Sequence, residues 1–163
     1  MTARLVAVAA FVSFLIAPGF ASAATNISDP VKFVTEVYGK IQKATEAKPY
    51  NPPDDIYTQH LNALFDLDKK EAGGEVGRID FDFWTNAQDW QLSGLKVTGL
   101  DVEGTKSRKI VVAKFKNLDR VEEIHFYFER GKSGWLLDDA RSTGNESWTL
   151  SVILKYGWAD APQ

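Results

Sequence analysis

The sequence predicts a single α+β domain, in which N-terminal helices pack on a curved antiparallel sheet of about four strands and one helix follows the sheet. Between residues 30 and 65, apolar residues recur at intervals of three and four, as on one face of a helix. From Leu95 onward, apolar and polar residues alternate, as in strands with one buried face. Short turns separate the alternating stretches, so neighbouring strands should pair antiparallel.

Residues 1–23 have the pattern of a signal peptide. Arg4 gives a basic start, the stretch LVAVAAFVSFLIAPGF is apolar and uncharged, and the triplet at 21–23 matches the small-x-small cleavage pattern. We expect cleavage between Ala23 and Ala24, which leaves residues 24–163 as one domain. A retained transmembrane anchor is the competing interpretation, but the apolar run is shorter than the usual spanning length of about 20 residues. No cysteine follows the run, which excludes a lipid-anchored lipoprotein.

The composition of the expected mature chain indicates where the protein is located and which partners it is expected to bind. Removing Arg4 leaves 18 Lys and Arg against 22 Asp and Glu, a net charge of −4. No basic stripe is present, so nucleic acid is not an expected partner. The chain has no cysteine, so an exported form has no disulfides and depends on a core rich in Phe, Tyr and Trp. These features favour a bacterial periplasm or secretion, without membrane contact after cleavage.

Two helices are expected before the sheet. The first begins at Pro30, is capped by Ser28 or Asp29, and fades before Pro49. Its apolar stripe has helical spacing and consists of Val34, Val37, Tyr38 and Ile41.

The second helix is expected to begin near Asp54 or Asp55, after a proline-rich loop, and to stop at Gly73-Gly74. Residues 75–90 have no clean period, which predicts an ordered loop with one helical turn at 86–90.

Four strands and a last helix complete the expected order. The first strand begins at Leu95, and its alternation slips at Gly99, which predicts a β-bulge or a bend there. The other three strands are expected at 109–116, 121–130 and 135–140. Asn145 should cap a final helix from about Glu146 to Tyr156.

Three stretches resemble an exported bacterial family called domain of unknown function 3828. They are FVTEVYGKI, the DFDxxxxAQDW stretch from Asp80 to Trp90, and GKSGWLLDDAR, and together they span most of the mature chain. Members often have Pro where this chain has Phe83. The element order also resembles the nuclear transport factor 2-like folds, in which helices pack into the hollow of a bent sheet to form a cone with a pocket. The resemblance implies this fold and an exported compartment, and it implies no established activity.

The densest cluster of polar and aromatic side chains is IDFDFWTNAQDW, residues 79–90. Its Asp-x-Asp start at Asp80 is typical of a calcium loop, but such a loop needs a glycine at its sixth position and a glutamate at its twelfth. Those positions hold Thr85 and Gln91, which excludes an EF-hand. A looser oxygen site using the carboxylates at 80, 82 and 89 stays open.

Zinc chemistry and nucleophilic catalysis have little support in the sequence. The chain has no Cys, and its two histidines, His60 and His125, are far apart without paired spacing. It has no Gly-x-Ser-x-Gly elbow and no HExxH motif. Asp138-Asp139 forms a second carboxylate pair, and paired carboxylates can act as acid and base when their environments separate their pKa values. We predict no metal, no cofactor and no assigned catalytic residue.

The leading functional hypothesis is a binding or accessory protein that holds a small ligand or a partner segment in a pocket. The first alternative is a small hydrolase or isomerase that uses a pocket Asp with His60 or His125. The second is an inhibitor or immunity-type protein that binds an exported partner, and a homodimer is compatible with the sequence. A structural role for the carboxylates, as acceptors that fix turns, competes with all three. The candidate ligand-binding residues are Tyr38, Tyr57, Asp80, Asp82, Trp84, Gln88, Asp89 and Trp90.

Overall fold

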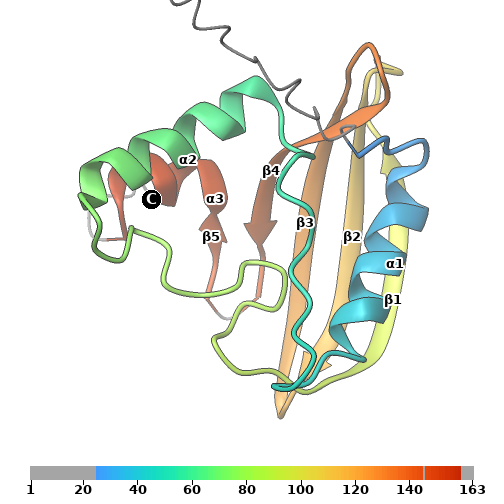
Figure 1. Cartoon of the computed structure of the whole chain (residues 1–163). Coiled ribbons are helices and arrows are strands. Elements are labelled where there is room, and N and C mark those ends of the chain that lie inside the picture. The colour runs from blue at the N-terminus through green and yellow to red at the C-terminus, as the bar shows by residue number, and fades with distance from the viewer. Residues whose placement is uncertain (1–24, 145, 159–163) are drawn as a thin grey trace, which may run out of the picture.

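The fold is α+β, with an open five-stranded antiparallel sheet and three helices (Figure 1). The computed structural model describes residues 25–144 and 146–158, so the expected signal peptide and the cap at Asn145 lie outside the described residues. The helices are α1 (Pro30–Ile41), α2 (Gln59–Ala72) and α3 (Leu150–Tyr156). The strands follow each other in the sheet in chain order: β1 (Leu92–Asp101), β2 (Arg108–Asn117), β3 (Arg120–Arg130), β4 (Trp135–Ser142) and β5 (Trp148–Thr149). In the part of the chain that is described, no helix is long and apolar enough to cross a membrane.

Helix α1 lies on one face of the sheet, against β1 and β2 (Figure 1). It begins as expected, because the Asp29 carboxylate accepts hydrogen bonds from the backbone N–H groups of Val31 at 2.9 Å and Lys32 at 3.2 Å. The predicted apolar stripe is buried. Gly99 faces this helix, and a Cβ there would lie 2.7 Å from Val31 Cγ2. Gly99 therefore permits close helix packing, and the β-bulge predicted at this glycine is wrong.

The bulge in β1 lies earlier, between Ser93 and Lys96. Gly94 stands in this irregularity with φ at +63°, a conformation that glycine adopts without a Cβ penalty. Gly99 pairs with Val111 in regular register. The alternation slipped at Gly99 because Leu100 is an apolar residue on the outer face, where it is 46% exposed.

Helix α2 starts later than expected, at Gln59. The preceding residues pair with the edge of β4: Leu137 N–H donates to Ile56 O at 2.8 Å, and Thr58 N–H donates to Leu137 O at 2.9 Å. The Thr58 hydroxyl then caps the helix by accepting from Leu61 N–H at 3.2 Å. The predicted stop is confirmed, because Gly73 ends the helix in the left-handed conformation.

The two edges of the sheet differ. The outer edge of β4 is covered by Ile27, which bridges to Trp135, by Tyr57, which bridges to Leu137, and by β5. Within residues 25–144 and 146–158, no strand pairs with the outer edge of β1. The fifth strand is a correction to the expected four, and β5 is only two residues long.

The final helix also differs from its predicted bounds. It begins at Leu150, after β5, and Thr149 occupies its N-cap position without a side-chain cap bond. Helix α3 packs against α2 and β4 at the end of the sheet opposite α1 (Figure 1).

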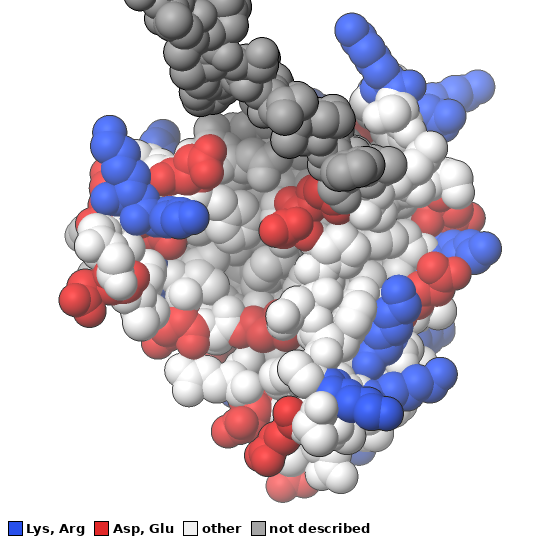
Figure 2. All heavy atoms as spheres, viewed as in Figure 1, with Lys and Arg blue, Asp and Glu red and all other residues white. Residues whose placement is uncertain are grey.

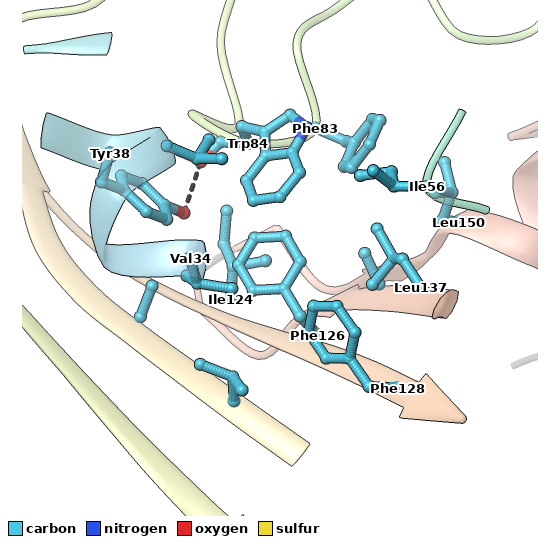
Figure 3. Packing of buried hydrophobic residues seen from close by; sticks show 14 of the residues in the cluster. Val34, Tyr38, Ile56, Phe83, Trp84, Ile124, Phe126, Phe128, Leu137 and Leu150 are labelled. Atoms are coloured by element: carbon cyan, nitrogen blue, oxygen red, sulfur yellow. Dashed lines mark hydrogen bonds between the residues drawn. The ribbon is translucent and has the colours of Figure 1, made fainter. Parts of the chain in front are cut away.

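The core lies between the sheet, α1 and a tryptophan from the loop that precedes β1. Trp84 is 2% exposed and stacks on Phe126 of β3 with ring centroids 4.5 Å apart (Figure 3). Tyr38 of α1 meets Trp84 edge-on at 6.1 Å. Aromatic contacts of this kind add to the stabilisation from buried area. The loop is therefore anchored in the core and is a fixed part of the fold.

Candidate functional site

The loop between α2 and β1 contains a tight turn at residues 82–87. Asp82 and Ala87 form a backbone bridge, and Thr85 N–H donates to Asp82 O at 3.1 Å. The Asp82 carboxylate accepts from Trp84 N–H at 2.9 Å, as in an Asx turn. The helical turn predicted at 86–90 is wrong, because these local bonds close the chain into a turn instead.

A buried hydroxyl holds this turn against α1. Tyr38 is fully buried, and its hydroxyl donates to the Trp84 carbonyl at 2.6 Å (Figure 3). Burial, and less strongly the charges of Asp82 and Glu122, raise the pKa of Tyr38 well above its usual range. The hydroxyl therefore stays protonated and acts as a donor. Tyr38 supports the loop from within the core and is not among the residues that line the cleft described below.

A second anchor is a buried polar cluster around Asn86. The Asn86 amide donates to Glu122 Oε2 at 2.9 Å, and its carbonyl oxygen accepts from Trp148 Nε1 at 2.6 Å. Arg120 pairs with Glu122 at 3.4 Å. Asn86 has φ at +54°, which asparagine tolerates better than most residues. The cluster joins the loop, β3 and β5.

This cluster was not predicted from the sequence, although one signal for it was present. Glu122 occupies the same strand parity as Ile124, Phe126 and Phe128, which face the core. A carboxylate on the apolar face of a strand needs a buried partner. The identity of that partner depends on long-range contacts that no local pattern gives.

The turn, α2 and the segment before α2 enclose a cleft of about 440 Å³. Figure 2 shows this face of the molecule, which is hollowed between α2 and the sheet, with Asp and Glu around the hollow and most Lys and Arg further out. Polar groups in the lining come from Asn51, Asp68 and Asp82. The aromatic lining residues are Tyr50, Tyr57, Phe65, Phe81, Phe83, Trp84 and Trp90.

The candidate residues divide into two groups. Tyr57, Asp82, Trp84 and Trp90 line the cleft, with Trp84 almost wholly buried and Trp90 37% exposed. Tyr57 lies 25 positions before Asp82 in the chain. Its backbone bridge to Leu137 of β4 places it at the cleft beside Asp82.

The remaining candidates lie outside the cleft. Asp80 and Gln88 are exposed, and the Gln88 amide donates to the Asp80 carbonyl at 3.0 Å, which closes the base of the turn. Asp89 is exposed beside Trp90, at a separate depression of about 290 Å³ that Thr45 and Pro49 also line.

Burial and charge set the protonation of the cleft's polar groups. Burial raises the pKa of Asp82, against the lowering effect of its hydrogen bonds from Trp84 and Thr85. Burial, with the nearby charges of Asp54 and Asp82, raises the pKa of Tyr57 to about 12. Tyr57 is therefore a neutral hydroxyl at physiological pH.

The second carboxylate of the cleft, Asp68, is neutralised within the protein. It accepts from Arg78 N–H at 2.9 Å and pairs with the Arg78 guanidinium at 3.7 Å. Arg78 also binds Glu71 and donates to the Leu154 carbonyl at 3.1 Å. This arginine therefore joins α2 to α3.

Of the other titratable candidates, His125, Asp138 and Asp139 have structural partners. His60 is exposed on α2, and His125 lies on the outer face of β3, 2.7 Å from Glu123, so neither lines the cleft. Asp138 accepts from the Thr58 hydroxyl at 2.7 Å, and Asp139 accepts from the Ser151 hydroxyl at 2.6 Å.

The described stretches contain no group of three or more His, Asp and Glu side chains placed to hold a metal ion. Asp80 and Asp89 are exposed at the ends of the turn, whereas Asp82 turns inward to the cleft.

Comparison with known proteins found no match: no family model, no curated protein and no solved structure matches this chain. The resemblance to domain of unknown function 3828 therefore stays a prediction, and the function has to be argued from the cleft.

Proposed function

We propose that this protein is an exported binding protein that holds a small ligand, or a segment of a partner, in the cleft between α2 and the loop at 79–90. The observation that carries the proposal is the convergence of Tyr57, Asp82 and Trp90 from separate parts of the chain on one cavity. Its volume of about 440 Å³ lies within the usual range of small-molecule sites, about 300–1,000 Å³.

The lining has the composition of a ligand site. Aromatic rings supply apolar area at low cost in conformational entropy, and a few polar groups orient a ligand. The cleft is also preformed, because the turn that bears Asp82 is fixed by the bonds of Tyr38 and Asn86. The proposal also takes residues 1–23 as a signal peptide and the packing of α1 on the sheet as part of a nuclear transport factor 2-like cone.

The enzyme alternative gains no support from these contacts. A pocket Asp acting with a histidine needs both side chains in one cavity. His60 and His125 lie outside the cleft that contains Asp82.

One observation favours a protein partner as a second candidate. Tyr156 and Trp158, at the end of α3, are 42% and 49% exposed, and the Trp158 ring lies 5.6 Å from Phe81 at the border of the cleft. Exposed aromatic side chains are enriched at protein interfaces. An exported partner that covers this border would fit an inhibitor or immunity-type role.

A crystallographic fragment screen tests the binding proposal. We expect fragments to gather in the cleft, and we expect Trp90→Ala to abolish their binding while the melting temperature falls by only a few degrees. Tyr127→Phe, on the outer face of the sheet, is the matched control and should leave the fragments in place. Fragments scattered over the surface, or occupancy unchanged in Trp90→Ala, would contradict the proposal.

A further inference from the structure

The charged side chains that line the cleft are all acidic. Among its lining residues are the carboxylates of Asp68 and Asp82, and none is Lys, Arg or His. Arg78 neutralises Asp68, as described above. Asp82 has no such partner: no basic side chain in the described ranges lies within 4.0 Å of it. Asp82 is thus the one carboxylate of the lining without a neighbouring cation from the described part of the chain.

This arrangement is unfavourable without a ligand. The Asp82 carboxylate accepts a hydrogen bond from the Trp84 backbone N–H, a neutral donor, and the neighbouring Thr85 hydroxyl, which donates to the Asp82 backbone carbonyl, is also neutral. A carboxylate that is largely removed from water and lacks a counter-charge is costly. A cation placed in the cleft would offset that cost, whereas an anion would increase it.

The surrounding rings favour the same charge. Tyr57 and Phe65 contact each other with ring centroids 5.1 Å apart, and both line the cleft with Phe81 and Trp90. The faces of such rings carry negative potential and attract ammonium groups. Tyr50 at the edge of the cleft already has an ammonium over it, since Lys40 Nζ lies 5.3 Å from its ring centroid.

We propose that the cleft binds an alkylammonium group, with the ammonium at Asp82 and its carbon chain among the rings of Tyr57, Phe65, Phe81 and Trp90. This inference rests on the proposed binding function and names its ligand class. A free amine and the side chain of a lysine in a partner peptide present the same group.

Three probes of nearly equal shape test the charge preference: benzylammonium, benzyl alcohol and benzoate, with charges of +1, 0 and −1. Binding to the unmodified protein is followed by calorimetry or NMR titration at constant ionic strength. We expect benzylammonium to bind at least about tenfold more tightly than the other two, because it alone pairs with a desolvated carboxylate.

Two variants localise the effect. Asp82→Asn keeps an acceptor for the Trp84 N–H and removes the charge, so benzylammonium affinity should fall about tenfold while benzyl alcohol affinity stays unchanged. Asp80→Asn removes an exposed charge two residues away and should change neither affinity by more than about twofold. If Asp82→Asn folds poorly, the comparison of the three probes on the unmodified protein still tests the preference for a cation.

The outcomes separate the two proposals. Equal or tighter binding of benzyl alcohol or benzoate, weakened by Trp90→Ala, would overturn the cation preference and leave the binding function standing. No saturable binding of any probe at millimolar concentration would also overturn it, and the fragment screen would then judge the binding function separately. Titration of Nα-acetyl-lysine-N-methylamide against its Nε-acetylated form assigns the source: a preference for the charged form comparable to that of benzylammonium indicates a lysine side chain, and a much weaker one indicates a free amine.

Discussion

Removing the Tyr38 hydroxyl should lower the free energy of unfolding substantially, although the substitution deletes only one heavy atom. Tyr38→Phe keeps the ring and its contacts with Phe115 and Phe126, at centroid distances of 5.2 and 6.2 Å. It deletes the donor that lies 2.6 Å from the Trp84 carbonyl. Among the described residues no other donor bonds to this carbonyl, so the change leaves a buried acceptor without a partner.

The expected cost is about 1–3 kcal/mol, the range for an unsatisfied buried polar group. For a domain of roughly 140 residues, each kcal/mol lowers the melting temperature by about 2–4 °C, so we expect a fall of about 2–12 °C. Urea unfolding should show the same loss in free energy with an unchanged m value. Hydrogen exchange should quicken at the amides of residues 83–86, because the turn loses its anchor to α1.

Tyr127→Phe is the matched control for this prediction. Tyr127 is half-buried on the outer face of β3, and its hydroxyl has no hydrogen bond to the described part of the chain. The control should change stability by less than about 0.5 kcal/mol. If Tyr38→Phe is as stable as this control, the hydroxyl does not hold the turn and the reasoning about the site's rigidity is refuted.

Three further changes test other contacts. Asn86→Ala should cost about 2–4 kcal/mol in urea unfolding, because it leaves the Trp148 indole N–H without its acceptor and removes the amide donor to Glu122, which keeps only Arg120. A loss below about 1 kcal/mol would contradict the cluster's role. Gly99→Ala should lower the free energy of unfolding by about 1–3 kcal/mol because its Cβ meets Val31, and Val31→Ala in the same chain should recover most of that loss if the clash is the cause. Burial raises the pKa of Asp82 in the folded protein, so the contribution of this side chain to the free energy of unfolding is present below about pH 4 and is lost as the pH rises through the raised pKa. Asp82→Asn should therefore lose less stability than the parent between about pH 4 and 7. If the free energy of unfolding from urea curves changes equally with pH in the two proteins, this reasoning is refuted.

The sequence predicted the elements whose signals are local. Asp29 and Pro30 mark the start of α1 by capping chemistry, and Gly73 marks the end of α2 by its conformation. The clean alternation of β3 located that strand to within one residue of its start. These features depend on residues within one turn or one strand of each other.

The features that the sequence did not predict depend on distant partners. Residues 56–58 continue a helical pattern but pair with β4, because an open strand edge offers backbone bonds that the first turn of a helix lacks. Strand β5 is too short to show any alternation. The cleft is lined by the segment before α2, by α2 and by the loop at 79–90, and the first two lie at least 22 and 11 positions before that loop, so the polar and aromatic cluster at 79–90 located only one wall.

The unequal edges of the sheet limit how copies of this protein can associate. A strand edge with unpaired backbone groups is a template for another chain. In the described structure, β4 is covered by Ile27, Tyr57 and β5, while β1 is open. Two copies joined through their β1 edges would be related by a two-fold axis and would use up the open edge of each. Edge pairing through β1 alone would therefore end at a pair, and a growing fibril would also have to use the other side of the sheet, where Ile27, Tyr57 and the two-residue strand β5 lie along β4.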